Sequence, residues 1–175
     1  MPSPADVWAS TQDFLELGGG VLVALLVVTF VMWTLILERW QYLRSQLATD
    51  VAAVTGEWKR RAERSSWHAH QIRRELVSRV SQRLHRSMPT IKTLVALCPL
   101  LGLLGTVTGM IEVFEVMAFA GSGNPRAMAQ GVSRATIPTM AGMVAALSGL
   151  LVAAQLERRL DTEAERLADA LSPEP

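Results

Sequence analysis

The sequence contains few of the residues from which covalent, redox or metal chemistry is built. Its single cysteine, Cys98, lies inside an apolar run, which excludes a disulfide framework and a cysteine-built metal site. His68 and His70 are two residues apart and therefore lie on different faces of a helix. No nucleophile is paired with a base, and no glycine-rich phosphate loop stands at a strand–helix junction. We therefore expect no enzyme, no metal and no cofactor.

Lysine and arginine are absent from the first seventeen residues. A cleavable signal peptide begins with a positively charged region, so we expect none here. Residues 1–17 instead indicate a short interfacial helix, with Ser3 as its N-cap and Pro4 at its first position. The glycine triplet at residues 18–20 would let the chain turn into the segment that follows.

Charge is also nearly absent from three long apolar runs, although 19% of all residues are charged. Residues 18–37 contain no charge and, as a helix, would cover roughly the 30 Å of a hydrocarbon core. Residues 93–119 and 131–156 form the second and third runs. The rest of a 175-residue chain could not cover three such helices in water. The sequence therefore predicts an all-α membrane protein with three transmembrane helices.

Positive charge is distributed so that all four connecting segments agree on one topology. Residues 38–92 hold twelve lysines and arginines, and the tail at residues 157–175 holds three. The loop at residues 120–130 offers only Arg126. The positive-inside rule then places the N-terminus in the periplasm, and residues 38–92 and the tail in the cytoplasm. This is the topology of a multi-pass protein of the bacterial inner membrane.

The cytoplasmic segments have helical patterns, so we expect helices that extend two of the spans. The basic stretch near Lys59 is typical of a solvated helix face, the alternative being a surface for anionic headgroups or RNA. We expect no nucleic-acid partner. In the tail, leucines at helical spacing indicate either packing between neighbouring subunits or a frayed surface helix; they are Leu156, Leu160, Leu167 and Leu171.

Small residues follow one side of the second and third runs. In the second run they are Gly102, Gly105 and Gly109, the last two forming a GxxxG pattern; in the third they are Ala135, Gly142, Ala146 and Ala153. Small residues let helix backbones approach one another in lipid, where packing holds helices together. We expect these positions to be packing contacts, and a ring of such stripes would leave room for a further helix in its middle.

Two hydroxyls, Thr106 and Thr139, stand beside these small residues, with Thr108 and Thr136 as weaker candidates. One interpretation is that each hydroxyl bonds to a carbonyl of its own helix. The other is that Thr106 and Thr139 line a polar path and offer a hydroxyl to a carboxylate or a water. The sequence leaves both open.

The segments GLLGTVTGM and RATIPTMAGMVAALSG together resemble the MotA/TolQ/ExbB proton channel family, and LERWQYLR resembles the end of the first span in ExbB and TolQ. The resemblance implies a pentameric ring around a dimer of a single-span partner, of which ExbD is one type. That partner carries the membrane aspartate that binds the proton, and residues matching Thr106 and Thr139 face the pore.

Within that family, the chain looks most like ExbB. The resemblance then implies a motor that uses the proton gradient to energise TonB, which serves outer-membrane import of siderophores, haem or cobalamin. The implied partners are further copies of this chain, an ExbD-type protein, TonB and membrane lipid. Alternatives are a TolQ-type subunit of an envelope-maintenance motor and a passive membrane scaffold.

The chain departs from the family at Arg134, where many ExbB proteins have a glutamate. Arginine stays charged and cannot bind and release the proton as a carboxylate does. Arg134, Glu112 and Glu115 all lie near the outer ends of their spans, where an ionisable group is expected to be paired. We expect Arg134 to pair with Glu112 or Glu115, within or between subunits; the alternative is that all three reach separately into the outer interface.

Overall fold

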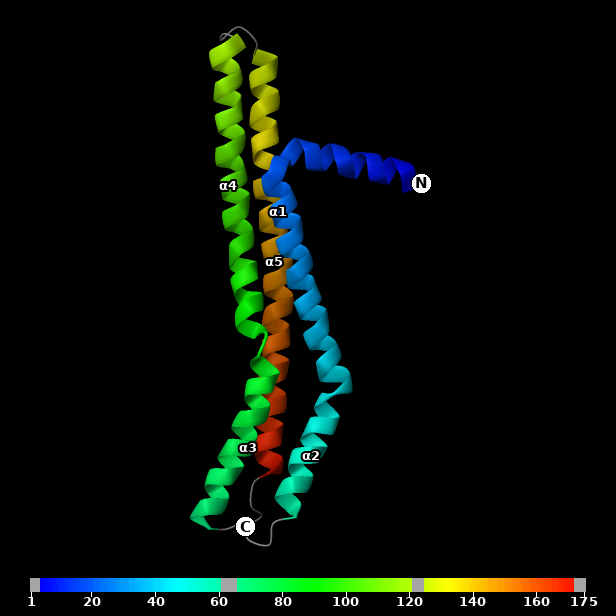
Figure 1. The fold of residues 1–175 in the computed structure, drawn as a ribbon, viewed down its shortest axis with the longest axis vertical. Helices are drawn as coiled ribbons and strands as arrows, with labels where there is room; N and C mark the ends of the chain where they lie inside the picture. The colour runs from blue at the N-terminus through cyan, green and yellow to red at the C-terminus, as the bar shows by residue number, and fades with distance from the viewer. Residues whose placement is uncertain (1–3, 61–65, 121–124, 172–175) are drawn as a thin grey trace. The chain divides into compact units, whose positions relative to one another are not determined.

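The computed structural model describes residues 4–60, 66–120 and 125–171, and these form five helices with no strand among them (Figure 1). They are α1 (Pro4–Ser45), α2 (Leu47–Lys59), α3 (Trp67–His85), α4 (Met88–Ala120) and α5 (Pro125–Ala170). Three stretches are long and apolar enough to cross a membrane: Gly19–Ser45, Trp67–Glu115 and Gly131–Ala170. The all-α class and the three apolar helices are confirmed; the pentameric ring, the domain boundaries and the topology stay predictions.

Helix α1 is interrupted at one residue, Gly19, whose φ is 62° and ψ is −166°. Glycine adopts positive φ without the steric cost that a Cβ brings, which explains why the interruption falls there. The turn predicted at the glycine triplet is therefore confirmed. The helix before it starts at Pro4, and the side chains of residues 4–18 lie outside the described part of the chain.

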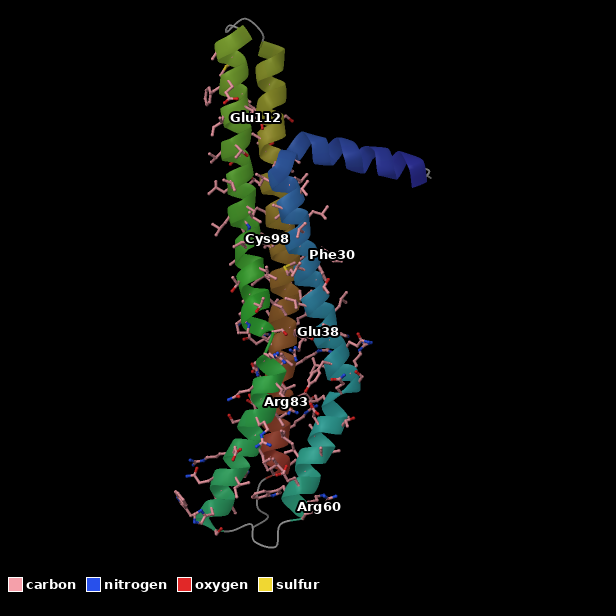
Figure 2. All side chains as sticks on the ribbon, viewed as in Figure 1. Phe30, Glu38, Arg60, Arg83, Cys98 and Glu112 are labelled. Atoms are coloured by element: carbon pink, nitrogen blue, oxygen red, sulfur yellow. The ribbon has the colours of Figure 1, made fainter. Side chains whose placement is uncertain are left out.

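The chain divides into two compact units, of which the first comprises Met1–Met32 and Thr93–Leu150. Its core contains Leu22 and Leu25 from α1 and Cys98 from α4, with Ala141 and Ala146 of α5 packed against them. Cys98 and Phe30 are labelled in Figure 2. Phe30 is 70% exposed. Many other large apolar side chains of this unit are also exposed, by smaller fractions. Such outward apolar surface suits lipid or other protein and not water.

The second unit comprises Trp33–Lys92 and Leu151–Pro175. Leucines of α5 and Leu171, which follows it, form much of its core; those at positions 156, 160, 167 and 171 are at most 2% exposed. Between α3 and α5, His85 Nε2 lies 2.9 Å from Asp161 Oδ1, and Arg73 donates to the carbonyl of Ala168 at 2.6 Å. These leucines are therefore covered within the chain itself, and both tail interpretations, packing between subunits and a frayed helix, were wrong for them.

Candidate functional site

The helices α4 and α5 approach one another so closely that backbone faces backbone. A Cβ added at Gly142 of α5 would lie 2.6 Å from the carbonyl oxygen of Cys98 and 3.2 Å from the Cα of Gly102, both on α4. A Cβ at Gly102 would lie 3.0 Å from the Cα of Thr139. Only glycine fits such a contact, and in lipid the dispersion contacts between two backbones hold helices together.

The contact continues towards the end of α4 through two further glycines. A Cβ at Gly105 would overlap the ring of Pro138, and one at Gly109 would lie 2.8 Å from the Cα of Ala135. We call this line of contacts the glycine seam, defined by Gly102, Gly105 and Gly109 of α4 with Ala135, Pro138 and Gly142 of α5. The seam brings Ala135 and Gly142 of the stripe into contact with α4 of the same chain. The room for a further helix in the middle of a ring stays a prediction.

Thr139 connects the two helices across the seam. Its hydroxyl donates to the carbonyl oxygen of Gly102 at 2.8 Å, and the residue is half-buried. Because the hydroxyl donates its one hydrogen there, its oxygen keeps lone pairs that can accept a hydrogen bond. The carbonyl of Gly102 thus accepts two hydrogen bonds, one from the Thr139 hydroxyl and one from the N–H of Thr106, its partner in an α-helix.

The other three candidate hydroxyls donate within their own helices. Thr106 donates to the carbonyl of Leu103 at 2.7 Å, and Thr136 donates to that of Ser133 at 2.8 Å. Thr108 shares its hydrogen between two carbonyls of the preceding turn. The sequence left two interpretations open for these residues. The own-helix bond forms at Thr106 but not at Thr139, which donates across the helix pair. The polar path lined by Thr106 and Thr139 stays a prediction.

The outer ends of α4 and α5 carry the ionisable candidates. Glu112, labelled in Figure 2, and Glu115 are both exposed on α4. The side chain of Arg134 lies outside the described residues, so its pairing with either glutamate stays a prediction. Between Thr93 and Ile111 of α4, and between Ala135 and Leu156 of α5, the sequence has no ionisable carboxylate.

Arg39 is a residue that the sequence analysis missed. It is only 4% exposed, donates to the carbonyl of Arg83 at 3.0 Å and to the Ser87 hydroxyl at 2.8 Å, and stacks over Tyr42. Its charge therefore lies at the C-terminal end of α3, where helix carbonyls without a helical partner favour a cation. The signal available in the sequence was its place directly after an apolar span, which on its own suggested only a charge at the membrane boundary.

Relatives are found among curated transport proteins. An ExbB-like biopolymer transport protein of Synechocystis is 44% identical over 73 residues, which cover 40% of this chain and 29% of that protein. The biopolymer transport protein exbB1 of Vibrio cholerae is 40% identical over 75 residues, covering 42% and 33%. The Tol-Pal system protein TolQ of Pseudomonas aeruginosa is 31% identical over 78 residues, covering 45% and 34%. The chain thus spans about a third of the length of each of these relatives.

The sequence model of one family extends well beyond these local matches. It covers residues 40–169, which include α2, α3, α4, nearly all of α5 and therefore the whole glycine seam. More of the matched relatives are named for ExbB than for TolQ. The chain belongs to the MotA/TolQ/ExbB proton channel family, and within it is most like ExbB.

Proposed function

We propose that this chain is the ring subunit of an inner-membrane motor driven by the proton gradient. Five copies would surround an ExbD-type single-span partner, with the N-terminus in the periplasm and the C-terminus in the cytoplasm. The motor would energise TonB and thereby the import of siderophores, haem or cobalamin through the outer membrane. This chain would supply the ring and the polar path, while the partner supplies the carboxylate that binds the proton.

The observation that carries the proposal is the hydroxyl of Thr139 at the glycine seam. It is held by Gly102 at 2.8 Å, is half-buried, and lies in a pair of apolar helices without a carboxylate at that depth. A hydroxyl of fixed orientation can accept a hydrogen bond from a protonated carboxylic acid or from a water. Since polar groups within a membrane are costly, one with remaining acceptor capacity is expected to serve a path.

The outward faces of α4 and α5 support an assembly. Large apolar side chains there are more than half exposed in the single chain, among them Leu103 and Val107 of α4 and Met140, Val144 and Leu147 of α5. Lipid would cover such faces, but so would neighbouring copies and a central apolar helix. In a ring, every subunit contacts one neighbour on each of two sides, so two such faces of each subunit are covered.

Uptake of an iron–siderophore complex tests the proposal in a strain that lacks this gene and any second system of the same kind. The strain is complemented with wild type, Thr139→Val or Thr139→Ser, and membrane levels of each variant are measured. Serine keeps the hydroxyl and valine keeps the shape, so we expect uptake with wild type and Thr139→Ser and its loss with Thr139→Val. Equal uptake with all three variants would remove Thr139 from the path.

The identity to TolQ favours one second candidate, a motor that maintains the cell envelope. In that case the deletion strain would take up iron normally but would leak periplasmic protein and be sensitive to detergent. If the chain is a passive scaffold, changing both Thr106 and Thr139 to valine should leave its function unchanged, provided that membrane levels are normal.

A further inference from the structure

A groove in the second unit runs between the α1–α2 segment and α5, with a volume of about 650 Å³. Four arginines line it: Arg44 from α1, and Arg158, Arg159 and Arg166 from α5. Its one acidic residue, Glu163, forms an ion pair with Arg166 at 2.6 Å. Among the described residues, no carboxylate lies within 4 Å of the other three guanidinium groups. The groove therefore has an excess of three positive charges.

Two of these guanidinium groups are held at the same tryptophan. The guanidinium carbon of Arg44 lies 5.5 Å from the centroid of the Trp40 ring, and that of Arg159 lies 4.8 Å from it. Each cation is attracted by the ring. The two cations repel one another, however, and an anion placed beside both would offset that repulsion.

The position of Trp40 along α1 places this pair at the boundary of the apolar layer. Trp40 is three residues beyond Leu37, where the first apolar run ends, and Arg159 is three residues beyond Leu156, where the third ends. At 1.5 Å per residue each lies about 4.5 Å outside the hydrocarbon, within a headgroup layer roughly 5–8 Å thick. Arg44 starts further out, but its side chain reaches back to the ring of Trp40.

A second cavity nearby provides a comparison. It is lined by Arg39, Arg83 and Arg86 but also by Glu38 and Asp50, and Asp50 accepts from the Tyr42 hydroxyl and lies 3.9 Å from Arg83. Its charges are nearly balanced by the chain itself. The groove beside Trp40 lacks such balance, and leucines at positions 43 and 47 add an apolar wall to it. An anion therefore fits the groove better than it fits the second cavity.

We propose that the groove binds the headgroup of an anionic phospholipid, with Arg44 and Arg159 holding the phosphate beside Trp40. The planar guanidinium donates two parallel hydrogen bonds to phosphate oxygens, which lysine cannot do. The part of the headgroup beyond the phosphate lies towards Leu43 and Leu47, which are further from the apolar layer than Trp40. This proposal depends on the membrane insertion of the two apolar runs and not on proton transport, so either can fail without the other.

Lipid retention measures the site directly. The full chain is reconstituted with equal amounts of phosphatidylglycerol and phosphatidylcholine, extracted in mild detergent, and analysed by native mass spectrometry. We expect retained phosphatidylglycerol in wild type and little in Arg44→Gln with Arg159→Gln. Each arginine near a membrane surface contributes about a fivefold preference, so the double variant should bind on the order of twentyfold less. The double variant Arg44→Lys with Arg159→Lys should recover only part of the phosphatidylglycerol retention.

The matched control is Arg60→Gln with Arg74→Gln, which removes the same charge from exposed positions of the second unit outside the groove. Equal loss in this control would show general attraction to anionic lipid and overturn the site. Displacement of the lipid by glycerol 3-phosphate at similar concentration would identify a free phosphate as the ligand instead. Unchanged retention in the groove variant, with native helix content by circular dichroism, would also refute the proposal.

Discussion

The glycine seam makes Gly142 the position where the smallest added group should have the largest effect. In Gly142→Ala, the new methyl group would lie 2.6 Å from the carbonyl oxygen of Cys98, about 0.8 Å nearer than an ordinary contact of 3.4 Å. The opposing atom belongs to the backbone and cannot rotate away. The two helices must therefore separate, and a similar shift at the next turn would stretch the 2.8 Å bond from Thr139 to Gly102 beyond hydrogen-bonding range.

Overpacking of this kind costs about 1–3 kcal/mol, and loss of a hydrogen bond between membrane helices adds roughly 0.6 kcal/mol. The gain in helix propensity from glycine to alanine offsets about 1 kcal/mol of this. Gly20→Ala is the matched control, because nothing lies within 4 Å of a Cβ there and its φ is not positive. We expect the free energy of unfolding of Gly142→Ala to fall below that of Gly20→Ala by about 2–4 kcal/mol.

Unfolding by sodium dodecyl sulfate from mixed micelles, followed by circular dichroism, measures this difference on the full chain. A destabilised Gly142→Ala together with a neutral or stabilised Gly20→Ala is the expected result. If both substitutions shift the unfolding midpoint equally and in the same direction, the effect is one of helix propensity. The close approach of α4 and α5 would then not be present in the protein in solution.

Three further substitutions test the second unit and the outer ends of the spans. Leu160→Ala removes a fully buried side chain and should lower the free energy of unfolding by about 2–5 kcal/mol, measured by the same titration. Arg39→Met removes the two hydrogen bonds to Arg83 and Ser87 but keeps an apolar stem of similar length. We expect the free energy of unfolding to fall by roughly 1–3 kcal/mol. An unchanged unfolding midpoint would show that the buried cation contributes nothing to stability. If Arg134 pairs with Glu112, Arg134→Glu should impair siderophore uptake, and adding Glu112→Arg should restore it. A double variant as impaired as either single variant would count against that pairing.

Much of the fold could be predicted because membrane helices are encoded by long local patterns. The three apolar runs contain almost no charge, and the turn at Gly19 follows from a glycine triplet. Contacts between helices were harder to predict. The stripe of Ala135 and Gly142 indicated a close contact, but its spacing alone does not distinguish a helix of the same chain from one of another chain.

The site shows the same division between local and distant information. A hydroxyl in an apolar helix can donate to its own preceding turn, and for Thr106 this local bond is what forms. The acceptor of Thr139 lies 37 residues earlier in the sequence, so its choice depends on the register between α4 and α5. The burial of Arg39 likewise depends on the end of α3 lying beside it, which no local pattern specifies.

The atoms that face each glycine also determine which mutations a second mutation can suppress. At Gly142 the opposing atoms are a carbonyl oxygen and a Cα, so no side-chain change on α4 can make room for a larger residue. At Gly149 the opposing atoms are the sulfur and methyl group of Met32 and a methyl group of Val95, and shortening Met32 would create the space that an alanine needs. A genetic screen should therefore recover suppressors of Gly149→Ala at position 32, whereas losses at Gly142 should revert only to glycine.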